Sequence, residues 1–105
     1  MIINEHFIRG FLYRKGTLGF QRPVGRKVPY PYVRFKVSDD VEIWKLIFVF
    51  FHKKSIFLDL WKDEIYVRGN DNLKDFFAFF EKDNYAGWKE RPKWGEFCEV
   101  LKIGR

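Results

Sequence analysis

The sequence predicts an α+β domain in which helices alternate with antiparallel β-hairpins. Two stretches, 17–38 and 55–68, each contain a pair of strand-like segments, and apolar residues at helical spacing flank both stretches. Of the 105 residues, 47% are hydrophobic and 21% aromatic, which is enough apolar side chain for a core. This length fits one domain over residues 1–105, excludes multidomain enzymes and makes association with a second copy favourable.

The first predicted helix has helical spacing over residues 5–14, and Gly16 marks its expected end. Its apolar residues Phe7, Ile8, Phe11 and Leu12 fall at helical spacing. A glycine inside a helix costs about 1 kcal/mol relative to alanine. Gly10 therefore predicts a close contact between this helix and another backbone.

Both hairpins are predicted to place a core face opposite a polar face. The first pairs 17–22 with 32–38, and the second pairs 55–60 with 64–68. Because side chains alternate along a strand, the core face receives Val33, Phe35, Val37, Ile56, Leu58, Ile65 and Val67. The other face receives Tyr32, Arg34, Lys36, Phe57, Asp59, Trp61, Tyr66 and Arg68. We expect the part of this second face that strand 32–38 contributes to be cationic.

Three further helices are predicted near residues 39–52, 70–80 and 92–101. Asp39 and Glu42 have capping-box spacing, and apolar residues around most of the second helix predict that it is largely buried. The third helix carries the core stripe Leu73, Phe76, Phe77 and Phe80. Pro92 suits the first turn of the last helix, whose buried stripe is Trp94, Phe97, Cys98 and Leu101.

The positive charge is concentrated near the start of the chain. The formal net charge is +6, and residues 1–38 contain eight basic side chains but one acid, Glu5. Such asymmetry indicates a surface that binds a polyanion, most often nucleic acid. The alternative is a basic face that is simply solvated.

Several classes of site are excluded by residue content. The single cysteine, Cys98, forms no intrachain disulfide and no zinc pattern with His6 and His52. No apolar run reaches the roughly 18 residues of a membrane helix, and no phosphate-binding glycine loop or nucleophile elbow is present. We therefore expect an intracellular protein without a membrane segment.

Segment 7–18, with the sequence FIRGFLYRKGTL, resembles the signature helix of the LAGLIDADG homing endonuclease family. Gly10 and Gly16 match its two glycines, and Ile8, Phe11 and Leu12 match its apolar positions. Segments 39–51 and 73–80 resemble the family's second and third helices. In 85–89, Lys89 matches one of two lysines common in the family, with Trp88 in place of the other. The resemblance spans about residues 4–102 and implies an αββαββα fold with a curved four-stranded antiparallel sheet, followed here by an extra C-terminal helix.

The same resemblance implies a homodimer on duplex DNA. The signature helices of two units would pack together, here through Phe7, Gly10, Phe11 and Arg14, and each sheet would enter the major groove. Phosphate contacts would come from Arg22, Arg26, Lys27 and Lys89. Groove contacts would come from Tyr32, Arg34, Lys36, Tyr66 and Arg68.

The family's catalytic acid is replaced in this sequence. Lys15 stands at the acid position just before the last glycine, and Tyr13 stands at the motif's other acidic position. Metal-assisted phosphodiester cleavage needs an anionic oxygen ligand, which a lysine ammonium does not supply. We therefore expect a DNA-binding protein without a cofactor, in which Lys15 takes the place of the metal and contacts phosphate. Alternatively, Lys15 extends into solvent at a helix end, where a cation is favourable.

Three other functions remain open from the sequence. An active site-specific endonuclease would use Mg²⁺ with an acid from elsewhere, and Asp59 and Glu64 are then the candidates, unless they are plain strand or turn acids. An RNA-binding splicing cofactor would use the same sheet on structured RNA. A structural protein would have no nucleic-acid role, with its aromatic residues in the core and its charge serving solvation.

Overall fold

The order of helices and hairpins agrees with the sequence prediction. A computed structural model describes residues 4–13, 15–22, 24–25 and 29–104. The elements are α1 (Glu5–Leu12), β1 (Thr17–Gln21), β2 (Tyr30–Lys36), α2 (Val41–His52), β3 (Asp59–Trp61), β4 (Glu64–Arg68), α3 (Asn70–Ala78), a 3₁₀ turn (Glu81–Asp83) and α4 (Trp94–Leu101). None of the helices in this described part is long and apolar enough to cross a membrane.

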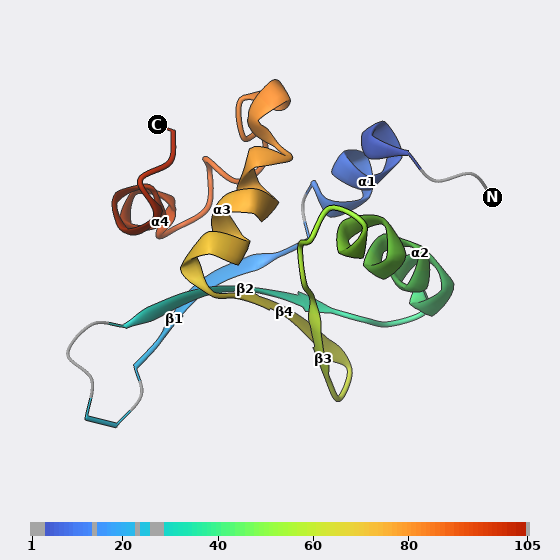
Figure 1. The fold of residues 1–105 in the computed structure, drawn as a ribbon, viewed down its shortest axis with the longest axis horizontal. Helices are drawn as coiled ribbons and strands as arrows, with labels where there is room; N and C mark the ends of the chain where they lie inside the picture. Colours follow the sequence, from blue (N-terminus) through green and yellow to red (C-terminus); the bar gives the residue numbers. More distant parts are fainter. Residues whose placement is uncertain (1–3, 14, 23, 26–28, 105) are drawn as a thin grey trace.

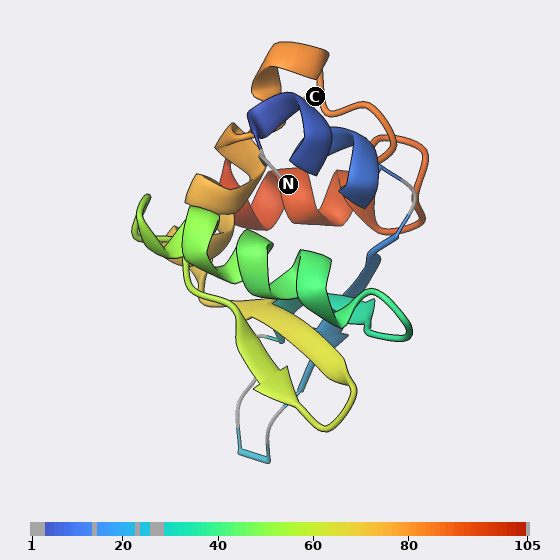
Figure 2. The same cartoon turned by 90° about the vertical axis from the view of Figure 1, so that its right-hand side faces the viewer.

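The four strands form one antiparallel sheet in the order β1-β2-β4-β3. Figure 1 shows α1, α2, α3 and α4 on one side of this sheet, and no helix of the described residues lies on the other side. In both views α2 lies between α1 and the β3–β4 hairpin (Figures 1 and 2). The α+β class and the αββαββα order with an added C-terminal helix are thus confirmed.

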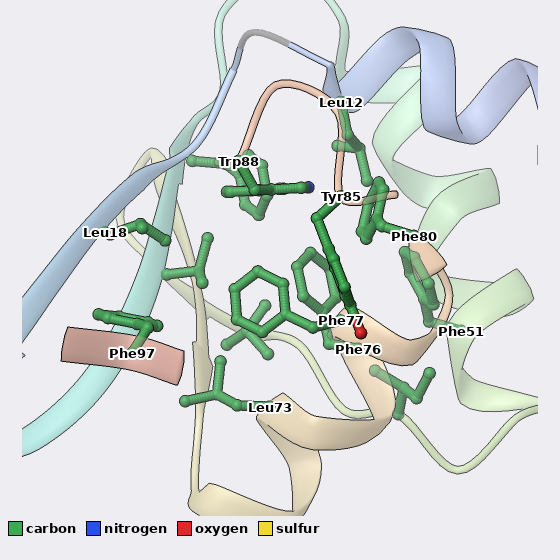
Figure 3. Packing of buried hydrophobic residues seen from close by; sticks show 14 of the residues in the cluster. Leu12, Leu18, Phe51, Leu73, Phe76, Phe77, Phe80, Tyr85, Trp88 and Phe97 are labelled. Atoms are coloured by element: carbon green, nitrogen blue, oxygen red, sulfur yellow. The ribbon is translucent and has the colours of Figure 1, made fainter. Parts of the chain in front are cut away.

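The core lies between the sheet and the helices, and aromatic rings dominate it (Figure 3). Trp88 is fully buried, and its ring meets those of Phe35, Phe76, Phe77 and Phe80 at centroid distances of 5.3 to 6.2 Å. These mostly edge-to-face contacts join β2, α3 and the segment before α4. The aromatic content predicted to form a core does so.

Helix α4 extends the core toward β1. Its Phe97 ring lies 5.0 Å from that of Phe20, and Trp94, Phe97, Cys98 and Leu101 are all buried as predicted. The predicted start is wrong by two residues, because α4 begins at Trp94 after Lys93, which has a left-handed φ of 76°. Pro92 precedes the helix instead of lying in its first turn.

Two expectations for the second helix are wrong. Helix α2 begins at Val41, and the Asp40 carboxylate accepts a hydrogen bond from the Ser38 amide instead of capping the helix, so no Asp39–Glu42 capping box forms. The helix is also not largely buried, because it is covered only where it meets the sheet and α1. Val41 and Val49 on its other side are 46% and 54% exposed.

The predicted strand 55–60 pairs only from Asp59 onward. Before that point, the Asn72 side chain takes the place of a neighbouring strand. Its Oδ1 accepts from the Phe57 amide at 2.8 Å, and its Nδ2 donates to the Phe57 carbonyl at 2.7 Å and the Arg68 carbonyl at 3.1 Å. The side-chain amide satisfies these backbone groups without a ladder, which explains why β3 is short.

Candidate nucleic-acid interface

The uncovered face of the sheet gathers the predicted groove residues. Strand register and alternation place twelve side chains or glycines on it. They are Thr17, Gly19, Gln21, Tyr30, Tyr32, Arg34, Lys36, Asp59, Trp61, Glu64, Tyr66 and Arg68. The buried Val33, Phe35, Ile65 and Val67 occupy the opposite face, so the predicted alternation is confirmed for β2 and β4. In β3 all three residues are exposed, so this strand has no buried face.

Tyr66 is the centre of this face. Its hydroxyl donates to Glu64 at 3.2 Å, and its ring lies 5.7 Å from that of Tyr32. The guanidinium carbon of Arg68 lies 4.5 Å from the centroid of the same ring, which is a cation–π distance. These contacts hold polar and aromatic groups from β2 and β4 in one layer.

Gly19 allows the Tyr32 ring to lie across β1. A Cβ atom at Gly19 would lie 2.5 Å from Cζ of Tyr32 and 2.6 Å from its hydroxyl oxygen. Sequence reasoning missed this glycine, although an isolated glycine inside a strand often marks a close approach. Beside it, an open depression of about 550 Å³ is lined by Phe20, Gln21, Tyr32, Trp61, Tyr66 and Arg68.

The face is less cationic than predicted, because two acids pair with its two arginines. Arg34 Nε lies 3.4 Å from Glu64 Oε2, and Arg68 Nε lies 4.0 Å from Asp59 Oδ2. Register is the reason, since it sets each acid diagonally across from an arginine on the neighbouring strand. Lys36, at the end of β2, is exposed.

Lys15 and Arg91 lie near the end of α1 but behave differently. Lys15 is exposed, and its Nζ lies 4.7 Å from the centroid of the Phe11 ring. Arg91 instead donates to the carbonyls of Gly16, Gly87 and Tyr13, and burial lowers the pKa of its guanidinium. Its guanidinium also lies 4.3 Å from the Trp88 ring centroid. Sequence reasoning missed Arg91, because its partner Gly16 lies 75 residues away.

Two other predicted phosphate contacts, Arg22 and Lys89, lie outside the four strands. Arg22 is exposed just beyond β1, and Lys89 is half-buried in the turn after Trp88. Arg26 and Lys27, and Arg14 of the predicted dimer interface, lie outside the described residues.

Comparison with solved structures identifies the architecture. The LAGLIDADG homing endonuclease I-GzeII, in complex with its DNA target, superposes with a TM-score of 0.67 and 16% identity over 96% of this chain and 36% of that one. The homing endonuclease I-TnaI superposes with a TM-score of 0.61 and 20% sequence identity, over 97% of this chain and 74% of that one. The LAGLIDADG meganuclease I-AabMI, bound to uncleaved DNA, superposes with a TM-score of 0.61 and 16% sequence identity, over 96% of this chain and 38% of that one.

The chain has the fold of a LAGLIDADG homing-endonuclease domain. It spans 36 to 38% of the length of two of these neighbours and 74% of the third. No protein-family model matches it, and a search of curated proteins found no match. At these identities the likeness shows the fold alone.

The residues present do not fit the divalent metal used by LAGLIDADG endonucleases. After α1 the chain offers the Lys15 ammonium where a carboxylate ligand would be needed. Asp59 and Glu64 face arginines on the sheet, and Glu5, at the other end of α1, pairs with Lys54 at 3.3 Å. Among the described residues, no three or more His, Cys, Asp or Glu side chains come together as a metal site.

Helix α1 has one open side, and Gly10 lies on it. Nothing in the described chain would come within 4 Å of a Cβ at Gly10, so no contact inside that part of the chain accounts for this glycine. Phe7 and Phe11 are half-buried beside it, with their rings stacked at 6.2 Å and Phe11 packed edge-on against Trp44 at 5.6 Å.

Proposed function

We propose that this chain binds duplex DNA as a homodimer, through the uncovered sheet face, and does not cleave it. The observation that carries the proposal is the composition of that face: Arg34, Arg68, Lys36 and three tyrosines lie opposite the side that all four helices cover. Proteins that read DNA with a β-sheet place strands in a groove, and such side chains contact base edges and phosphates. Two neighbours with the same fold, I-GzeII and I-AabMI, were solved with DNA.

The open side of α1 supports a second copy as the dimer partner. A glycine in the middle of a helix is unfavourable unless something must approach the backbone closely. Gly10 has no such neighbour within the described chain, whereas the equivalent side of a second α1 would supply one.

The chemistry at the end of α1 supports binding without cleavage. Lys15 brings a cation to the place where the family's metal ligand would stand, and in a homodimer two Lys15 ammonium groups would lie close to the axis. Their repulsion is unfavourable unless an anion lies between them. DNA phosphates supply that anion.

The first experiment is a selection from a random duplex-DNA library on the purified protein with Mg²⁺ present, with sequencing of retained and of cut molecules. The proposal expects an enriched palindromic site that stays intact. Cut ends within that site would instead favour an active endonuclease. If no duplex is enriched, the proposal is wrong, and retention of a structured-RNA library in a parallel selection would indicate an RNA-binding role.

A further inference from the structure

We infer that Asp59 and Glu64 are positioning residues for DNA recognition, each holding one arginine so that it reads a guanine. The inference rests on the proposed function and names which groups of the sheet face would set sequence preference. It gives a role to two acids that lie on a surface proposed to meet a polyanion.

The geometry of the two ion pairs leaves the same part of each arginine open. Both carboxylates approach through Nε: Glu64 reaches Nε of Arg34 at 3.4 Å, and Asp59 reaches Nε of Arg68 at 4.0 Å. The edge formed by Nη1 and Nη2 is therefore the one that remains for a ligand. Two parallel N–H donors on one edge match O6 and N7 of guanine, the commonest specific arginine contact in the major groove.

Other contacts fix the direction in which these edges point. The Tyr66 hydroxyl holds Glu64 at 3.2 Å, and the Tyr66 ring lies beneath the Arg68 guanidinium at 4.5 Å. Arg34 and Arg68 nevertheless keep 41% and 46% of their side chains exposed. An arginine held at one edge and open at the other loses less rotamer freedom when it binds.

Two other arginines of the described chain, Arg91 and Arg9, differ from these two. Arg91 uses Nε, Nη1 and Nη2 on three carbonyl groups. Arg9 has only 14% of its side chain exposed and contacts Asp83 and Glu5. Both are engaged within the chain, whereas Arg34 and Arg68 have donors left for a partner.

The distance between Arg34 and Arg68 predicts the spacing of the two guanines that they would contact. Arg34 lies opposite Tyr66 and Arg68 lies opposite Tyr32, so the two arginines are diagonal neighbours on adjacent strands. Such positions are about 7–8 Å apart, and successive bases along one strand rise about 3.4 Å. The two guanines should thus lie about two base steps apart in each half-site.

The test measures the binding of the enriched duplex and of all its single-base variants. Arg34→Ala and Arg68→Ala should each lower the preference for guanine about tenfold at one position, and the two positions should differ. Glu64→Gln should reproduce the loss at the Arg34 position, and Asp59→Asn the loss at the Arg68 position. Removing either acid should not weaken overall binding, because a negative charge facing phosphates is lost.

Two controls separate positioning from charge. Asp63→Asn removes an exposed acid in the β3–β4 turn that contacts no arginine in the described chain, and it should leave every base preference unchanged. Lys36→Ala should weaken binding about equally for all sequences. Circular dichroism and thermal melting check that each variant is folded.

Three outcomes overturn the inference. If Glu64→Gln and Asp59→Asn keep the wild-type base preferences, the acids do not position the arginines, while the proposed function stands. If Glu64→Gln removes a preference that Arg34→Ala leaves intact, the acid itself accepts from a cytosine. If the wild-type protein retains no duplex, the proposed function fails and the inference fails with it.

Discussion

Single residues determine the connection between α1 and β1. Arg91 donates to the carbonyls of Tyr13 and Gly16 on this connection and to Gly87 beside it. Gly16 and Gly87 lie where a side chain would clash, with a Cβ at Gly87 only 2.3 Å from the Tyr13 oxygen. The position of Lys15 is set by this small, tightly packed group.

Replacing Arg91 with lysine should destabilise the protein by about 1–3 kcal/mol, because lysine lacks the planar fork that reaches three carbonyls and leaves some of them unpaired. Urea denaturation followed by tryptophan fluorescence measures the change. Arg22→Lys, at an exposed site, is the matched control and should unfold like the wild type. Equal midpoints for both variants would contradict the role given to Arg91.

Replacing Lys15 with alanine should weaken duplex binding and reduce the slope of log affinity against log salt by about one per protomer. The physical reason is the loss of one phosphate contact. Fluorescence anisotropy at several salt concentrations measures both quantities. Lys74→Ala on α3, on the covered side of the sheet, removes the same charge and should change neither. An unchanged slope for Lys15→Ala would leave this lysine as a solvated helix-end cation.

The lowered pKa of Glu5 predicts that the stability of the fold depends on pH. Its hydrogen bond with Lys54 is the main cause that lowers the pKa of the carboxyl from the ordinary 4.5, and the charges of Lys54, Lys82 and Arg9 act in the same direction. A lowered pKa means that the contribution is complete above pH 4.5 and is lost as the pH falls through the folded-state pKa. Glu5→Gln should therefore melt below the wild type at pH 7.

The two melting curves should converge below pH 4.5, where the wild-type carboxyl becomes protonated. Scanning calorimetry from pH 7 to pH 3 follows this convergence. Glu99→Gln, an exposed acid on α4, should stay parallel to the wild type. A gap between Glu5→Gln and the wild type that persists at low pH would mean that Glu5 acts through packing instead of charge.

At the scale of elements, contacts between elements decide two features that the periodicity of single strands did not predict: the length of β3 and the ion pairs of the sheet face. The segment before β3 is held by Asn72 from α3 and not by a longer strand. The arginines and acids of β2, β3 and β4 meet because of the strand register. The segment before β3 is thus tied to α3, whereas β3 itself is paired with β4.

Replacing Asn72 with alanine should cost about 1–2 kcal/mol, because the amide and carbonyl of Phe57 lose their partners. Hydrogen exchange at the Phe57 amide should become faster than exchange in β2. Asn70→Ala, an exposed asparagine in the first turn of the same helix, should leave exchange at Phe57 unchanged. If both variants exchange alike, the Asn72 side chain does not hold this segment.

The whole molecule has a covered and an uncovered sheet face, and an α1 helix open on the side of Gly10. A Cβ atom at Gly10 would have no neighbour within 4 Å in the described chain, and leucine favours a helix over glycine by about 0.8 kcal/mol, so Gly10→Leu should retain the fold. It should nevertheless block close packing of two α1 helices and give a monomer in analytical ultracentrifugation.

The control for this experiment is Gly95→Leu. Gly95 is also exposed in a helix, α4, and a Cβ atom added there would have no described neighbour within 4 Å. Its replacement should keep the oligomeric state of the wild type. A dimer that survives Gly10→Leu would remove α1 as the dimer interface.

Local periodicity was sufficient to predict the helices, both hairpins and the two faces of β2. Ile8 and Leu12, or Val33 and Phe35, are buried because a residue's face is set by the geometry of its own element. Periodicity failed where packing from outside decides, as on the exposed side of α2 with Val41 and Val49.

The contact partners of the site residues could not be predicted from the sequence and were decided by the tertiary structure. Arg91 reaches Gly16 across 75 residues, Asn72 reaches Phe57 across 15, and Tyr32 lies over Gly19 on a neighbouring strand. Asp59 and Glu64, read from sequence as metal-ligand candidates or plain acids, face Arg68 and Arg34. A residue's own spacing fixes its direction, whereas the group that it meets depends on register and on how distant segments pack.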